Sequence, residues 1–168
     1  MANTYTQIYI HVIFAVSGRQ SLLKKEFREK LHKYITGIIR NKGHKLIAIN
    51  SMTDHVHILI GLQPDTALSD LVRDVKANSS KFMNEQRWVV GKFSWQEGFG
   101  AFSYSHSQLD TIIQYIQNQE KHHSKKSFRE EYLEMLKKFQ VEYDTRYVFN
   151  WDEDEHLGWD KICRPLRG

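Results

Sequence analysis

The chain has 168 residues, of which 40% are hydrophobic and 12% aromatic, and its 24 lysines and arginines against 20 aspartates and glutamates give a net charge of +4 at pH 7. This length predicts one domain with a core large enough to fold without disulfide bonds or a structural metal. The single cysteine, Cys163, excludes a disulfide within the chain and a cysteine-based zinc site. No run approaches about 18 apolar residues, which excludes a membrane-spanning helix, and no charged leader precedes an apolar run, so we expect a cytoplasmic protein.

The first predicted strand covers residues 7–16, where apolar side chains alternate with polar ones. From about residue 24 to residue 41 the apolar period changes to that of a helix, which Lys42 and Gly43 should end. A short strand over residues 45–50 follows. The apolar face of the first strand is formed by Ile8, Ile10, Val12, Phe14 and Val16, and its other face by Gln7, Tyr9 and His11.

The next strand, residues 53–60, carries the most informative motif of the chain. Its alternation places the branched aliphatic side chains on one face and His55 and His57 on the other, roughly 6–7 Å apart. This spacing suits the binding of one divalent ion by both imidazoles, with Asp54 beside them. His-x-His also occurs by chance in strands, so a metal site needs a third ligand from elsewhere in the chain.

A helix over residues 65–86 and a strand over residues 101–105 complete the order β-α-β-β-α-β. This order predicts an α+β, ferredoxin-like fold in which both crossover helices cover one face of an antiparallel sheet. His11, His55 and His57 should then lie on the face that these helices leave open.

A further helix is predicted from Gln108 to Lys121, with a capping-box-like start at Ser107 and Asp110. Tyr115 and Gln119 lie off its apolar stripe, four residues apart and therefore on one face. Gln119 can supply a carbonyl oxygen to a metal, and Tyr115 a phenol oxygen as a nucleophile. The alternative is an ordinary amphipathic helix surface.

Ser127 and Glu130 match the capping box more closely and should open a last helix. No internal repeat, low-complexity run or linker divides the chain. We therefore predict a single domain over residues 1–150 and a polar, acidic C-terminal tail over residues 151–168.

These motifs together resemble the single-tyrosine HUH transposases, the IS200-like transposase family of small prokaryotic insertion sequences that move as single-stranded DNA. The resemblance is carried by Asp-His-Val-His at 54–57 and Tyr-Ile-Gln-Asn-Gln at 115–119. The run at 95–103 and Glu-Tyr-Asp at 142–144 are also similar to the family. The resemblance extends over about residues 5–150.

The resemblance implies an enzyme that cleaves and rejoins single-stranded DNA at insertion-sequence ends through a 5′-phosphotyrosine intermediate. His55, His57 and Gln119 would bind a divalent cation, Mg²⁺ or Mn²⁺, and Tyr115 would be the nucleophile. It also implies a homodimer acting on hairpin ends, with the tyrosine helix of one subunit serving the histidine pair of the other. His-His-Gln is an unusual set for Mg²⁺, which prefers oxygen ligands.

Other residues are weaker candidates. His11 and Asp54 could orient the imidazoles, and His122 and His123 should complement the dipole at the end of the tyrosine helix. A basic, aromatic-rich chain is compatible with a nucleic-acid partner, although a solvated charged surface and core packing are the alternatives. The candidate DNA contacts are Lys76, Lys81, Arg87, Lys92, Trp95 and Phe99.

Three other functions share parts of this pattern. A rolling-circle replication initiator or relaxase uses the same histidine pair, but the short chain and the spacing from Tyr115 to Gln119 argue against it. A noncatalytic nucleic-acid binder on a ferredoxin-like sheet predicts aromatic side chains on the open face, where this sequence has histidines. A domesticated transposase would have nearly the same sequence.

Overall fold

The computed structural model describes residues 3–148, so the predicted tail over residues 151–168, with Cys163, lies outside the described residues. Its centre is one antiparallel sheet in the order β2-β3-β1-β4, which is the ferredoxin-like order that the sequence predicts. The strands are β1 (Tyr9–Ala15), β2 (Lys45–Ser51), β3 (His55–Gly61) and β4 (Gly100–Tyr104).

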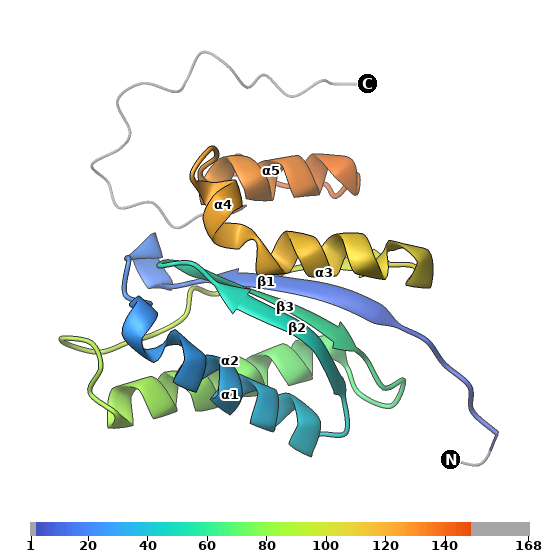
Figure 1. Ribbon diagram of the computed structural model, residues 1–168, viewed down its shortest axis with the longest axis horizontal. Helices are drawn as coiled ribbons and strands as arrows, with labels where there is room; N and C mark the ends of the chain where they lie inside the picture. Colours follow the sequence, from blue (N-terminus) through green and yellow to red (C-terminus); the bar gives the residue numbers. More distant parts are fainter. Residues whose placement is uncertain (1–2, 149–168) are drawn as a thin grey trace.

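Helices cover both faces of this sheet (Figure 1). The two crossover helices, α1 and α2, lie on one face, and α3, α4 and α5 lie on the other. No helix in the stretch from residue 3 to residue 148 is long and apolar enough to cross a membrane. The α-helices are α1 (Lys25–Asn41), α2 (Leu68–Glu85), α3 (Leu109–Gln117), α4 (Gln119–His123), α5 (Phe128–Lys138) and α6 (Thr145–Val148), and short 3-10 turns are η1 (Ser17–Arg19) and η2 (His106–Gln108).

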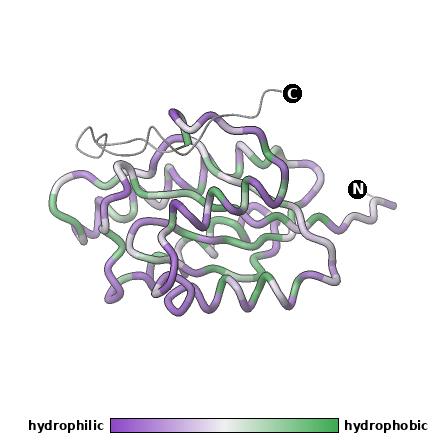
Figure 2. Tube along the Cα trace, turned by 90° about the horizontal axis from the view of Figure 1, so that it is seen from above, coloured by the Kyte–Doolittle hydropathy of each residue, from purple (hydrophilic) through white to green (hydrophobic). Residues whose placement is uncertain are grey.

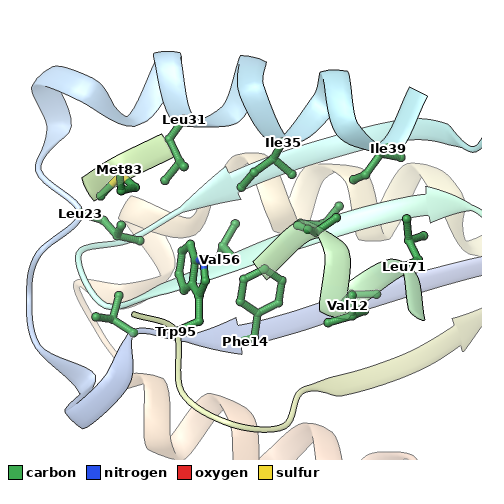
Figure 3. Close-up of a cluster of buried hydrophobic side chains, with 14 of the residues drawn as sticks. Val12, Phe14, Leu23, Leu31, Ile35, Ile39, Val56, Leu71, Met83 and Trp95 are labelled. Atoms are coloured by element: carbon green, nitrogen blue, oxygen red, sulfur yellow. The ribbon is translucent and has the colours of Figure 1, made fainter. Parts of the chain in front are cut away.

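The main core lies between the sheet and the crossover helices (Figure 3). Alternation along β1 and β3 turns every second side chain, among them Val12, Phe14 and Val56, toward α1 and α2, as the sequence predicts. Each fully buried Ile or Leu of this layer contributes about 1.5–3 kcal/mol by leaving water. The core residues labelled in Figure 3 are Val12, Phe14, Leu23, Leu31, Ile35, Ile39, Val56, Leu71, Met83 and Trp95.

The helices α1 and α2 are amphipathic, and hydrophobic and hydrophilic residues alternate along the chain at short intervals (Figure 2). In α1 the buried residues Phe27, Leu31, Ile35 and Ile39 recur every four positions and form one stripe. The helix ends where predicted, because Gly43 adopts a left-handed φ of 83° and its N–H donates to the carbonyl of Arg40.

The second sheet face, which we expected to be open, is covered by α3, α4 and α5. Ile112 and Ile116 of α3 pack against Ala48 and Leu59 of the sheet. Residues of α5 pack against the strand side chains Ile13, Ala15 and Phe102; the α5 members of this second cluster are Phe128, Met135 and Leu136. The histidines of this face are therefore inside the protein. The sequence signal for this cover was the apolar character of β1 on both faces.

The predicted helix from Gln108 to Lys121 is broken at Asn118, with α3 before the break and α4 after it. The Asn50 amide in β2 donates to the carbonyls of Ile116, at 2.8 Å, and Gln117, at 3.2 Å. These bonds satisfy carbonyls that a helix end leaves without partners. The chain then turns so that Gln119 is fully buried.

The helix starts follow the capping-box rule, but not always at the predicted residue. The capping box before α3 is formed by Ser105 and Gln108 around η2, and not by Ser107 and Asp110. The box that opens α5, Ser127 with Glu130, is confirmed.

Candidate active site

The candidate site is built on the first residues of β3, which begins at His55. Because β3 lies between β1 and β2, both histidines of the motif are fixed by two neighbouring strands, and both are fully buried. His55 Nδ1–H donates to Asp54 Oδ1 over 2.7 Å. His57 Nδ1 shares a 2.9 Å hydrogen bond with Nε2 of His11 on β1. Each imidazole therefore has its Nδ1 occupied, while its Nε2 has no hydrogen-bond partner.

Oriented imidazoles of this kind are what a metal site requires. A histidine ligand usually donates its second ring N–H to a carboxylate or another acceptor, which fixes the tautomer and aims the lone pair. Asp54 is such an acceptor for His55, and His11 Nε2 can be one for His57. Both residues thus lie where the sequence analysis expected groups that orient the pair.

Tyr115 and Gln119 reach the same place from the other side. The Tyr115 ring centroid lies 6.0 Å from that of His57, and the two rings meet edge to face. The Tyr115 hydroxyl donates to Glu131 Oε1, and Gln119 Nε2 donates to the same oxygen over 3.1 Å. The structure therefore brings together all four residues that the sequence analysis proposed as nucleophile and ligands.

Glu131 of α5 was missed in the sequence analysis. It is 2% exposed, and besides its hydrogen bonds with Tyr115 and Gln119 it approaches both histidines of the motif. Oε1 lies 3.6 Å from His57 Nε2, and Oε2 lies 3.8 Å from His55 Nε2. A usable signal was its position on the buried stripe of α5, three residues after Phe128 and four before Met135, where an acidic residue is out of place.

His123, at the end of α4, is the second residue missed as a member of the site. We predicted that it complements the helix dipole, but its Nε2 lies 2.6 Å from Glu131 Oε2. His122 Nε2 lies 4.0 Å from Glu131 Oε1 and its side chain is about a third exposed, so His122 lies at the edge of the site.

The charges of the site suit a cation. Burial lowers the pKa of His57 well below its ordinary value, and lowers that of His11 to about 3. Burial, followed by repulsion from His55, lowers the pKa of His123 to about 4. These three imidazoles are therefore neutral near pH 7, and the Nε2 atoms of His57 and His123 keep a lone pair for a metal. Burial, followed by repulsion from Asp54 and Glu134, raises the pKa of Glu131 to about 8.

Asp54 keeps its charge. Burial alone would raise the pKa of this carboxyl, but the hydrogen bond from His55 and the attraction of His55 and Arg19 bring it below its ordinary value. It can therefore support His55 as an ionised acceptor across the physiological pH range.

The donor atoms fit a bound divalent ion. One ligand atom from each of His55, His57, His123 and Glu131 lies within 4.8 Å of the other three. Unpartnered buried polar atoms are rare in proteins and need an explanation. Among the described residues, five of the eight such atoms belong to this site: His55 Nε2, His57 Nε2, His123 Nε2, Gln119 Oε1 and Glu131 Oε2.

A cavity of about 410 Å³ lies beside the site and is lined by residues of α3 and α5. Its lining includes the site residues Tyr115 and Glu131, together with Tyr104, Thr111 and Lys138. The cavity gives a substrate a route to the phenol although the histidines are buried.

The candidate DNA contacts are not gathered at this site. Lys76 and Lys81 belong to α2, on the opposite side of the sheet. Lys76 Nζ donates to the carbonyls of Gln96, at 2.9 Å, and Gly98, so it holds the loop before β4. Lys81 is exposed and pairs with Glu85 over 3.8 Å.

Of the four remaining candidates, Trp95 has a structural role. Trp95 is in the core, where its indole N–H donates to Ser79 Oγ over 2.9 Å, which favours the packing alternative over base stacking. Phe99 is 37% exposed. Arg87 and Lys92 are exposed in the segment between α2 and β4.

The chain is similar to known transposases in sequence and in fold. The family described as Transposase IS200 like matches residues 4–119, a range that contains the histidine pair, Tyr115 and Gln119. The ISDra2 transposase TnpA of Deinococcus radiodurans is 28% identical over 120 residues, which are 67% of this chain and 84% of that protein.

Two solved structures share the fold. A crystal structure of a candidate transposase from Deinococcus radiodurans R1 has 26% identity and a TM-score of 0.57, over 71% of this chain and 95% of that one. The structure of a REP-associated tyrosine transposase bound to a REP hairpin has 16% identity and a TM-score of 0.55, over 73% of each chain.

Proposed function

The chain belongs to the IS200-like family of single-tyrosine HUH DNA transposases, and on this premise we propose that it cleaves and rejoins single-stranded DNA through a covalent bond to Tyr115. The observation that carries the proposal is the meeting of the Tyr115 ring with the buried histidine pair, 6.0 Å from the ring of His57. We further propose that residues 1–150 act as one domain.

Tyr115 is the proposed nucleophile. Its oxygen attacks a backbone phosphorus in line, the O–P bond to tyrosine forms, and the bond from phosphorus to the 3′-oxygen breaks. The products are a 5′-phosphotyrosine and a free 3′-hydroxyl, which takes up a proton. An ordinary phenol has a pKa of about 10, so its proton needs an acceptor during attack; in this site the hydroxyl already donates to Glu131 Oε1.

The covalent intermediate explains why a tyrosine nucleophile allows the strand to be rejoined, which a water nucleophile does not. The phosphotyrosine ester keeps the energy of the broken phosphodiester, so a 3′-hydroxyl can attack it and rejoin the strand without ATP. A nuclease that used water would lose this energy. The chemistry is therefore strand transfer.

His55, His57 and Gln119 are the proposed core of a site for Mg²⁺ or Mn²⁺. Support comes from the unpartnered Nε2 atoms of both histidines and the unpartnered Oε1 of Gln119. When bound, the cation polarises the phosphate and stabilises the departing 3′-oxygen. The strands β1 and β3 hold the imidazoles in place before DNA arrives.

The proposed substrate is single-stranded DNA next to a hairpin. The REP-associated relative was solved with a REP hairpin, and the cavity between α3 and α5 gives an unpaired strand a route to Tyr115. Lys138 in the cavity lining offers a positive charge to the backbone.

Covalent labelling tests the proposal. A labelled single strand from the element's end is incubated with Mg²⁺ or Mn²⁺ and the protein is run on a denaturing gel. We expect label on the wild type and none on Tyr115→Phe. Binding without covalent label, across correct ends and both metals, would refute the enzymatic proposal and favour a noncatalytic DNA-binding protein.

A mixing experiment tests the predicted homodimer. In the single chain, Tyr115 lies beside its own His57, and the exchange of tyrosine helices between subunits stays a prediction from the family. Tyr115→Phe and His57→Ala proteins are each expected to be inactive. Exchange predicts that labelling returns when they are mixed, and continued inactivity would mean that each helix serves its own chain.

A further inference from the structure

Glu131 is a buried carboxylate whose basic neighbours, among the described residues, are all histidines. It is 2% exposed, and the basic side chains that approach it within 4.0 Å are His55, His57, His122 and His123. A buried charge is costly unless it is paired or coordinates a metal. The protein nevertheless places this carboxylate at the centre of its candidate active site.

The two oxygens of Glu131 face different groups. Oε1 accepts hydrogen bonds from the Tyr115 hydroxyl and from Gln119 Nε2. Oε2 accepts none, although it lies 2.6 Å from His123 Nε2 and 3.8 Å from His55 Nε2. These nitrogens also lack hydrogen-bond partners. One ligand atom from each of His55, His57, His123 and Glu131 lies within 4.8 Å of the others, which is close enough for one metal ion to contact all four residues.

We propose that Glu131, together with His123, ligates the divalent ion along with His55 and His57, through Glu131 Oε2 and His123 Nε2. The inference deepens the proposed function and rests on it, because it concerns the same metal centre. Since Oε1 of the same carboxylate accepts the Tyr115 hydroxyl, Glu131 links the metal centre to the nucleophile and fixes where the phenol oxygen lies.

The chemistry of the enlarged set removes a difficulty of the His-His-Gln set. Mg²⁺ and Mn²⁺ prefer carboxylate oxygen, and a site with neutral ligands alone would leave both charges of the ion uncompensated in a buried place. Glu131 supplies an anionic oxygen, and the ion supplies the positive charge that the carboxylate lacks. The helix α5, which follows the tyrosine helix in sequence, thereby contributes a ligand to the metal centre.

Manganese binding tests the proposal without any measurement of activity. Mn²⁺ is titrated into the full-length protein and the free ion is followed by electron paramagnetic resonance. Glu131→Gln keeps the size of the side chain and an oxygen that can accept from Tyr115, but it removes the anionic ligand. We expect Mn²⁺ affinity to fall at least about 10-fold, the lower end of the loss seen for residues that merely support ligands. His123→Gln should also weaken binding.

The matched control is Glu29→Gln, which removes an exposed glutamate from α1 and should leave Mn²⁺ affinity unchanged. Circular dichroism melting without metal checks folding, and we expect Glu131→Gln to melt no lower than the wild type because it removes a buried acid. If folded Glu131→Gln bound Mn²⁺ with wild-type affinity while His57→Ala lost binding, Glu131 would not be a ligand, although the metal centre itself would stand. No Mn²⁺ binding by the wild type would refute the proposed metal centre itself.

Discussion

Asn50 offers the sharpest test of how the fold builds the site. Its amide, on β2, donates to the carbonyls of Ile116 and Gln117, at 2.8 and 3.2 Å, where α3 ends. Asn50→Ala removes both donors. A net hydrogen bond contributes about 0.5–1.5 kcal/mol, so the two bonds together predict a loss of about 1–3 kcal/mol in the free energy of unfolding.

Asn50→Ala should also weaken metal binding. Gln119 follows the break directly, and its side chain is buried because the chain turns there. Without Asn50 the last turn of α3 can fray, so we expect weaker Mn²⁺ binding as well as lower stability. Urea unfolding measures the first effect, and Mn²⁺ titration measures the second.

Asn78→Ala is the control for this prediction. Asn78 also donates its amide to a backbone carbonyl, that of Asp74 at 2.8 Å, but it is exposed on α2. We expect its loss to change stability by no more than about 0.5 kcal/mol. If Asn50→Ala matched this control in stability, or lost stability with no change in Mn²⁺ affinity, the link between the helix break and the site would be refuted.

Three further predictions concern stability. The pKa of His11 is lowered to about 3 by burial, and burial followed by repulsion from Arg28 lowers that of His32 to about 4, so both are neutral when folded. The neutral forms of both histidines therefore stabilise the folded protein fully above pH 6.5, and this contribution is lost as pH falls toward 4, by up to about 1.4 kcal/mol per pH unit for each group. If urea unfolding showed no fall in the free energy of unfolding in this pH window, the prediction would be contradicted. Gly100→Ala should cost about 1–3 kcal/mol and displace α5, because the added Cβ would lie 2.7 Å from the Tyr132 ring; thermal unfolding checks it, and an unchanged melting temperature would be evidence against this packing. Ile35→Ala, in a fully buried position of α1, should cost about 2–5 kcal/mol in urea unfolding, and a loss below about 1 kcal/mol would mean that the site is not close-packed.

The order of strands and helices was predictable because it depends on local periodicity. Alternation along residues 53–60 was enough to place His55 and His57 on one face, since side chains of a strand point to opposite faces in turn. Helical spacing was likewise enough to pair Tyr115 with Gln119. Family resemblance then indicated what these four residues do.

The cover on the second sheet face could not be derived in this way. Ile13 and Ala15 are apolar on the face that carries the histidines, but only packing of α5 against them shows that this face is closed. The break at Asn118 is similar, because the donor that stabilises it, Asn50, lies 66 residues before Ile116 in the chain.

Glu131 shows most clearly what sequence periodicity cannot predict. An acidic residue on the buried stripe of α5 signals a special environment, but it does not say which groups surround it. The sequence by itself determined the elements and the faces of the histidines and the tyrosine, because those follow from contacts within one helix or strand. Only the tertiary structure decided that α5 brings a carboxylate to them, because that depends on how a helix docks onto strands more than 70 residues earlier in the chain.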